Sequence, residues 1–290
     1  MDKSKAGWIL VIAAAAAAGI SYRLIVLNRL EQTSLLFIGI PAIIALICVL
    51  TPKPASATGT ILKAVTLFIG IAGTFLGEGT ICLLMASPLF YIIGVIIGVA
   101  IDHAKKNSTM VTCLVFLAMV PMSSEGVHPR TSFNREEAIT AEQVIPATPD
   151  QVRAALNAPP QLGNKLPFYL RLGFPRPLAF NRTGSSVGDK ETIHFGGGEG
   201  KPGDLSLEIT EFSDHQLRFR ALSDTSHVAH WLKWEESTVL WSPVDATHTR
   251  VQWTLRYRRL LDPALYFGPW ERYAVRLTAR QLIQDAATPR

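Results

Sequence analysis

The sequence is short of charged residues. Of its 290 residues, 18% are charged and 48% are hydrophobic, whereas soluble domains carry about 25% charged residues. The shortage is uneven, because 12 of the 51 charged residues lie at positions 1–124 and the other 39 at positions 125–290. This excludes a single soluble enzyme spanning the whole chain and an intrinsically disordered chain, and it divides the chain into an apolar part and an ordinary one.

Cysteine is also scarce. Cys48, Cys82 and Cys113 stand in apolar runs and none follows, which excludes a disulfide scaffold and leaves the redox compartment open. Positions 125–290 have no marked excess of basic residues, because they hold 20 basic and 19 acidic residues. Most of the net charge of +5 therefore comes from the first part, with 8 basic and 4 acidic residues, where basic residues flank the apolar runs as they do around membrane helices. We expect no nucleic-acid partner.

Long apolar runs fill the first part. Residues 7–27 and 34–50 each approach the roughly 20 residues that cross a bilayer. Residues 61–101 are too many for one span at about 1.5 Å per residue, and predict two helices that meet at Gly77-Glu78-Gly79. Residues 109–122 form a short fifth span or an interfacial segment. The sequence thus predicts a transmembrane region of four or five helices at 1–124, a linker at 125–135 and a separate domain at 136–290.

The basic residues also set an expected orientation. With the N-terminus inside, six of them lie in inside loops and four in outside loops, a small bias that favours this orientation. Five spans would place the C-terminal domain outside the cytoplasm, and four would place it inside. We expect an integral protein of a bacterial plasma membrane with an extracytoplasmic C-terminal domain. Glu78 is either solvated in a turn at the interface or a functional acid within the hydrocarbon.

Residues 136–290 predict a mixed domain of one sheet and several helices. A strand at 138–147 precedes Thr148-Pro149-Asp150-Gln151, which has the capping threonine, early proline and acid of a helix start. Strand-like runs follow at 178–182, 190–195, 205–212, 217–222, 231–241 and 250–259. Apolar and polar residues alternate along these runs, which predicts an antiparallel sheet with one face exposed to solvent. A terminal helical segment starts at Asp262-Pro263, and we expect it to break at Gly268-Pro269 before continuing over 270–287.

Four stretches in this part carry a family resemblance: VIPATPDQVRAAL, GSSVGDKETIHFGGG, LSLEITEFSDHQLRFRA and TRVQWTLRYRR, followed by the terminal helix. They resemble the START-like superfamily, also called SRPBCC or polyketide cyclase-like, which has the helix-grip fold. The resemblance implies a curved antiparallel sheet around a long C-terminal helix, with an apolar cavity between them. Members bind lipids, sterols, polyketides or hormones, and some are cyclases or hydrolases. The expected fold class is therefore an all-α transmembrane bundle plus an α+β helix-grip domain.

The candidate ligand-binding residues are aromatic. Trp253 and Tyr257 lie on the inward face of the last strand, and the Tyr257 hydroxyl could orient a head group. Trp270 and Tyr273 share the early face of the terminal helix, where they could close a pocket. Trp231 completes the set. For each of them, a place in the core is an equal alternative, because such rings bury large apolar areas.

A second candidate group is Asp224, His227 and His230, spaced three apart. On one helical turn their side chains would point in the same direction. They could then bind a metal ion, form a polar cluster at the mouth of the cavity, or act as acid and base in an enzyme. They could equally be ordinary loop residues. We expect His194 to face solvent and glycines 196–200 to form a hairpin turn rather than a phosphate loop.

Four outward arginines have two interpretations: they pair with nearby acids, or they dock on anionic lipid head groups. These are Arg218, Arg220, Arg256 and Arg258.

The leading hypothesis is a membrane-anchored START-like domain that binds a hydrophobic small molecule, a lipid or an isoprenoid-like compound, beside the membrane. We expect no cofactor and no metal. The alternatives are a cyclase- or hydrolase-type enzyme, and a channel or transporter regulated by a ligand-binding domain.

Overall fold

The computed structural model describes residues 54–75, 80–106, 113, 117, 124–127, 132–160, 166–196 and 201–289. The chain divides into two compact units, Met1–Ser123 and Ser124–Arg290. Each unit is described by itself.

Two helices make up the described portion of the first unit, α3 (Ala57–Phe75) and α4 (Thr80–Lys106). The Asp102 carboxylate, near the end of α4, accepts hydrogen bonds from the backbone N–H groups of Ala57 and Thr58 at 2.7 and 2.9 Å. A carboxylate is favourable there because the first N–H groups of a helix have no partner within it. The contact holds the start of α3 against the end of α4, so the two helices run antiparallel.

The apolar run 61–101 thus forms two helices as predicted, while their junction, with Glu78, lies outside the described residues. Within the described part of the chain, one helical stretch, residues 83–104, is long and apolar enough to cross a membrane, and residues 57–70 form a shorter apolar helix. This does not support the expected bundle of four or five spans. The spans expected at 7–27 and 34–50, and nearly all of 109–122, lie outside the described residues.

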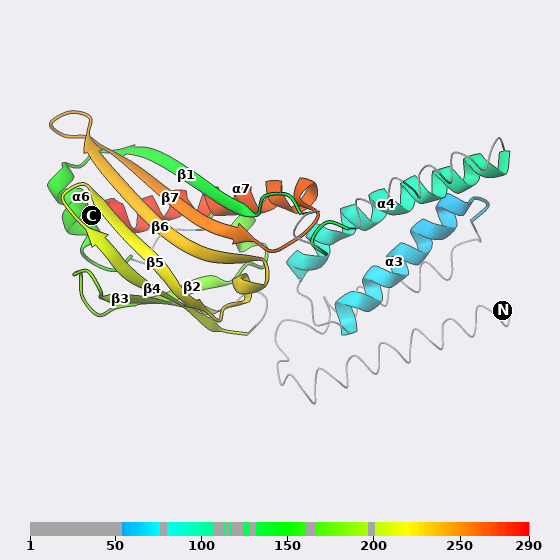
Figure 1. Cartoon of the computed structure of the whole chain (residues 1–290), viewed down its shortest axis with the longest axis horizontal. Helices are drawn as coiled ribbons and strands as arrows, with labels where there is room; N and C mark the ends of the chain where they lie inside the picture. The colour runs from blue at the N-terminus through cyan, green and yellow to red at the C-terminus, as the bar shows by residue number, and fades with distance from the viewer. Residues whose placement is uncertain are drawn as a thin grey trace. The chain divides into compact units, whose positions relative to one another are not determined.

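The second unit is built on one antiparallel sheet that curls around the long helix α7 (Figure 1). Its spatial order is β1-β7-β6-β5-β4-β3-β2. The strands are β1 (Glu136–Ile145), β2 (Arg176–Arg182), β3 (Lys190–Gly196), β4 (Gly203–Phe212), β5 (Gln216–Asp224), β6 (Leu232–Pro243) and β7 (Thr249–Arg259). The predicted antiparallel sheet and the long C-terminal helix are confirmed.

Alternation along the strands explains which face is buried. In β7, Val251, Trp253, Leu255 and Tyr257 are buried, while Arg256 and Arg258, on either side of Tyr257, are exposed. Register shifts interrupt the pairing of β4 with β5 and of β6 with β7. Such irregularities bend strands, which fits a sheet that wraps a helix.

Helix α6 (Pro149–Leu156) begins as the sequence predicts. The Thr148 hydroxyl accepts from the backbone N–H of Gln151, and the Gln151 side chain accepts from the backbone N–H of Thr148, which completes a capping box. Val152 and Leu156 then point into the core. A 3-10 turn, Tyr169–Arg171, lies between α6 and β2.

The break expected at Gly268-Pro269 is wrong. Helix α7 runs unbroken over Ala264–Leu282 with Pro269 inside it, and a π-helical turn, Ile283–Ala287, continues it. A proline in a helix costs roughly 3 kcal/mol. The helix buries Val275, Ala279 and Ile283 completely or nearly so, and we attribute its continuity to this packing along the sheet.

Candidate functional site

A cavity of about 430 Å³ lies between the sheet and α7. This volume is within the range of roughly 300–1,000 Å³ that is usual for small-molecule sites. Most lining side chains are apolar, and they come from the inner face of the sheet, from α7 and from the segment after residue 165. They include Leu166, Leu170, Phe174, Phe180, Ile193, Leu205, Leu207, Trp231, Trp234, Leu255, Val275 and Leu282.

The space remains open because two positions on facing elements carry small side chains. Ala221 of β5 and Ala274 of α7 both line the cavity, where larger residues would reach toward the opposite wall. The core around the cavity is continuous, with Leu217, Val239 and Tyr257 fully buried or nearly so. The cavity is therefore framed by a well-packed scaffold.

An aromatic cluster forms one side of this cavity. Tyr169 stacks on Trp270 with ring centroids 6.4 Å apart, and meets Tyr273 edge-on at 5.1 Å. It also contacts Phe174 at 5.3 Å, and Phe174 meets Trp231 at 5.4 Å. Phe174 and Trp231 line the cavity. Burial, followed by the neighbouring Tyr273, raises the pKa of Tyr169 to about 12, so its hydroxyl stays protonated.

The cluster brings three of the five predicted aromatic residues together. Trp231 lines the cavity, whereas Trp270 and Tyr273 stand behind Tyr169 and are 38% and 52% exposed. Sequence reasoning missed Tyr169 and Phe174, which join them. The aromatic content of the short segment before Pro175 was the available signal.

The predicted Asp224, His227 and His230 lie at the end of β5 and in a 3-10 turn, His227–His230. The rings of His227 and His230 are 5.0 Å apart, and His227 meets Trp231 at 5.1 Å. The Asp224 carboxylate instead accepts the backbone N–H of Ser226 at 2.8 Å, and burial raises its pKa. Across the described residues, no group of three or more His, Cys, Asp or Glu side chains could hold a metal ion.

Trp253 and Tyr257 lie in the core, which is the alternative that the sequence leaves open for them. Trp253 donates its indole N–H to the Ser237 hydroxyl at 2.9 Å and borders a chamber of about 30 Å³. Tyr257 is fully buried against Trp234, with ring centroids 6.0 Å apart. Among the residues that line the larger cavity, neither Trp253 nor Tyr257 is present.

The small chamber holds a buried ion pair. Arg182 and Glu191 side chains are 5% and 4% exposed, and the Arg182 Nε group donates to Glu191 at 2.6 Å. Arg182 also donates to the carbonyl of Leu156 at 2.8 Å, which ties the end of α6 to the sheet. Burial raises the pKa of Glu191 more strongly than Arg182 lowers it. Ser237 and Leu282 are shared with the lining of the larger cavity, so the chamber adjoins it.

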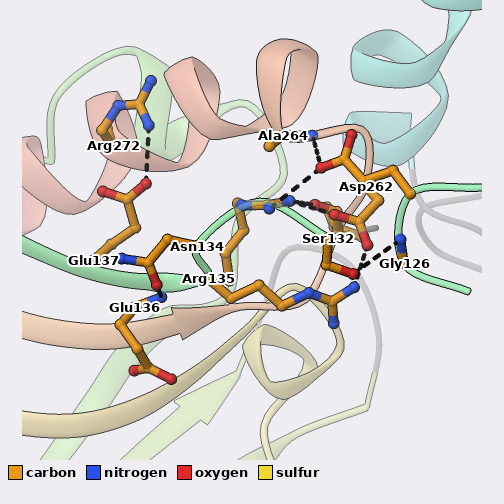
Figure 2. A network of polar contacts seen from close by, with 12 residues as sticks. Gly126, Ser132, Asn134, Arg135, Glu136, Glu137, Asp262, Ala264 and Arg272 are labelled. Atoms are coloured by element: carbon orange, nitrogen blue, oxygen red, sulfur yellow. Dashed lines mark hydrogen bonds and ion pairs between the residues drawn. The ribbon is translucent and has the colours of Figure 1, made fainter. Parts of the chain in front are cut away.

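A polar network surrounds the start of α7 (Figure 2). The Glu125 carboxylate accepts the backbone N–H of Ala264 at 3.0 Å and lies 3.7 Å from the Arg259 guanidinium. Asp262 pairs with Arg259 at 2.7 Å and also with Arg135. Arg259 is only 1% exposed, so these carboxylates compensate a buried charge.

Glu271 lies two helical turns beyond Ala264 on α7 and is 5% exposed. Its carboxyl oxygens make no hydrogen bond within the described structure. Burial raises its pKa to about 8, against the lowering effect of Arg259 and with further raising by Glu137 and Asp262. Burial, followed by the nearby Glu271, also raises the pKa of Tyr257. Glu271 is thus largely protonated at neutral pH.

The outer face of the sheet carries paired charges. Arg220 lies 2.6 Å from Glu208, Arg258 lies 3.9 Å from Glu136, and Arg218 lies 3.8 Å from each of two glutamates. Arg256 lowers the pKa of Glu235, whose overall shift is upward through burial. The arginines therefore have acidic neighbours.

His194 does not simply face solvent, because its Nδ1 lies 2.6 Å from the Asp204 carboxylate with the side chain 45% exposed. The expected glycine turn after Gly196 lies outside the described residues.

No protein-family model and no curated protein matched the sequence. Several solved structures are similar in part. Norcoclaurine synthase from Thalictrum flavum, in complex with dopamine and hydroxybenzaldehyde, is 15% identical over 51% of this chain and 87% of its own, with a TM-score of 0.33. Ginseng major latex-like protein 151 from Panax ginseng is 10% identical over 52% of this chain and 99% of its own, also at 0.33. Likenesses at this level say nothing of ligand or activity.

Proposed function

We propose that the second unit binds a hydrophobic small molecule in the cavity between the sheet and α7. The observation that carries this proposal is the volume of about 430 Å³ with a mostly apolar lining. Taking about 30 Å³ for a water-sized group, it has room for a ligand of about a dozen non-hydrogen atoms. Removing apolar surface from water contributes about 25 cal/mol per Å², so such a lining favours an apolar guest over water.

The proposal includes a membrane location, with the binding unit outside the cytoplasm and a lipid or isoprenoid-like ligand. Residues 83–104 support it by their length and composition, and the apolar runs earlier in the sequence agree. The full chain should remain in membranes washed with alkaline carbonate. In a variant without native cysteines, Ala154→Cys should react with an impermeant maleimide in intact cells. Release by carbonate or protection of that cysteine would contradict these two parts of the proposal.

The cavity can be tested in the full chain in nanodiscs. Trp231 and Trp234 line it, and bromine quenches indole fluorescence on contact, so 11-bromoundecan-1-ol should quench the protein saturably. Ala274→Phe would place an aromatic ring in the cavity and should abolish the saturable component. Ala154→Phe, on the exposed side of α6, is the matched control and should leave it intact. Quenching that is equal in the wild type and Ala274→Phe would refute the proposal.

A further inference from the structure

The cavity lining has one polar edge, and α7 and its π-helical extension supply it. Thr278, Gln281 and Asp285 all line the cavity. They are spaced three and four residues apart, which places them on one side of a helix. Gln281 is 6% exposed, so its amide is an interior group of the molecule.

These three side chains all carry acceptor oxygens. Gln281 donates from Nε2 to the Asp285 carboxylate, whose two oxygens lie at 3.2 and 3.0 Å, and the Gln281 carbonyl oxygen is an acceptor. The Thr278 hydroxyl donates to the carbonyl of Ala274 at 3.1 Å and keeps its lone pairs. The Asp285 carboxylate adds two more acceptor oxygens.

Three other polar residues border the cavity, namely Arg176, Glu236 and Ser237. Arg176 is exposed and donates to the carbonyl of Arg171 at 3.3 Å. The Glu236 carboxylate accepts the Thr238 hydroxyl at 2.9 Å and lies 3.8 Å from Arg218 of the outward set.

We propose that the ligand is an amphiphile with a hydrogen-bond-donating head group, a hydroxyl or a protonated amine, held by Gln281 and Asp285. This rests on the proposed function, since it assigns the chemistry of a guest in the same cavity. A hydroxyl or ammonium can donate to the Gln281 carbonyl oxygen and to the Asp285 carboxylate, which both line the cavity, while the apolar chain of the ligand fills the rest of the space. A carboxylate head group would bring a second negative charge beside Asp285 and no donor.

The test compares three probes of one chain length with the full chain in nanodiscs at neutral pH. They are 11-bromoundecan-1-ol, 11-bromoundecylamine and 11-bromoundecanoate, each corrected for its own partition into protein-free nanodiscs. We expect the alcohol and the amine to reach half-maximal quenching at concentrations at least about tenfold lower than the acid, which corresponds to about 1.4 kcal/mol.

Two variants make the expectation specific. Gln281→Leu and Asp285→Asn should each reduce the preference to about threefold or less. Gln284→Leu changes an exposed glutamine three residues away and should leave the preference unchanged, as should Asp214→Asn, at a side chain 73% exposed. If Gln281→Leu does not fold, the isosteric Asp285→Asn still decides the matter.

The outcomes separate the two proposals. Saturable quenching by all three probes with equal strength, or a preference that survives both variants, would overturn the head-group assignment and leave the cavity proposal standing. If no probe gives quenching that is lost in Ala274→Phe, both proposals are overturned.

Discussion

Replacing Glu271 with glutamine should remove a large part of the pH dependence of the stability of the second unit. The Glu271 carboxyl is 5% exposed, and burial is the main reason that its pKa rises from 4.5 to about 8. The charged groups around it are Arg259 and Arg272, which lower the pKa, and Glu137 and Asp262, which raise it. At about 1.4 kcal/mol per pKa unit, the shift corresponds to a cost of at most about 5 kcal/mol when the folded protein is fully ionised at this site.

The sign follows from proton binding. Between pH 4.5 and 8 the folded state keeps the Glu271 proton and the unfolded state has lost it, so stability falls as pH rises. Its contribution is fully present below pH 4.5 and is lost once pH passes 8. Glu271→Gln stays neutral throughout, so the stability difference between variant and wild type should be small at pH 5 and largest near pH 9. For a unit of this size, about 5 kcal/mol corresponds to roughly 10 to 20 °C in Tm.

The assay is thermal unfolding of the full chain in nanodiscs, followed by tryptophan fluorescence from pH 5 to 9. Five of the six tryptophans lie at positions 231–270, so the signal reports the second unit. Glu142→Gln, at a side chain 46% exposed on β1, is the control and should show a difference that changes little with pH. Parallel Tm curves for the wild type and Glu271→Gln would refute the reasoning.

Two further predictions concern the buried ion pairs. Glu125→Ala removes a partner of the buried Arg259 and the acceptor at the start of α7. It should lower the free energy of unfolding, measured in urea, by about 2 kcal/mol. The exposed Glu136→Ala serves as control, and equal effects of the two variants would contradict the structural role of Glu125. Arg182→Met leaves Glu191 buried without its partner and should lower the free energy of unfolding by about 3–5 kcal/mol. Adding Glu191→Leu should restore most of that free energy. A double variant that is no more stable than the single one would count against this.

The sheet was predictable because its signal is local. Strands with one buried face alternate along the chain, as β7 does, and Thr148 carries a complete capping box within four residues. The continuity of α7 was not predictable from the same kind of rule, since the effect of Pro269 is local while the packing of Val275 and Ile283 is not.

The cavity lining was less accessible to sequence reasoning. Alternation places Tyr257 and Trp253 on the inner face, as observed, but it cannot say where α7 leaves space along the strand. That depends on small residues such as Ala274 on another element. The aromatic cluster depends on Tyr169 meeting residues about a hundred positions away, a proximity that only the folded chain provides.

The hydrogen bond from Ala264 to Glu125 decides where the second unit can be cut from the chain. Glu125 is the second residue of that unit, and Ala264 is the first residue of α7. A fragment that starts after residue 125 would lose the acceptor at the first turn of α7 and a carboxylate beside the buried Arg259. Because α7 forms one wall of the binding space, such a truncation would disturb that space from a position 139 residues away in the sequence.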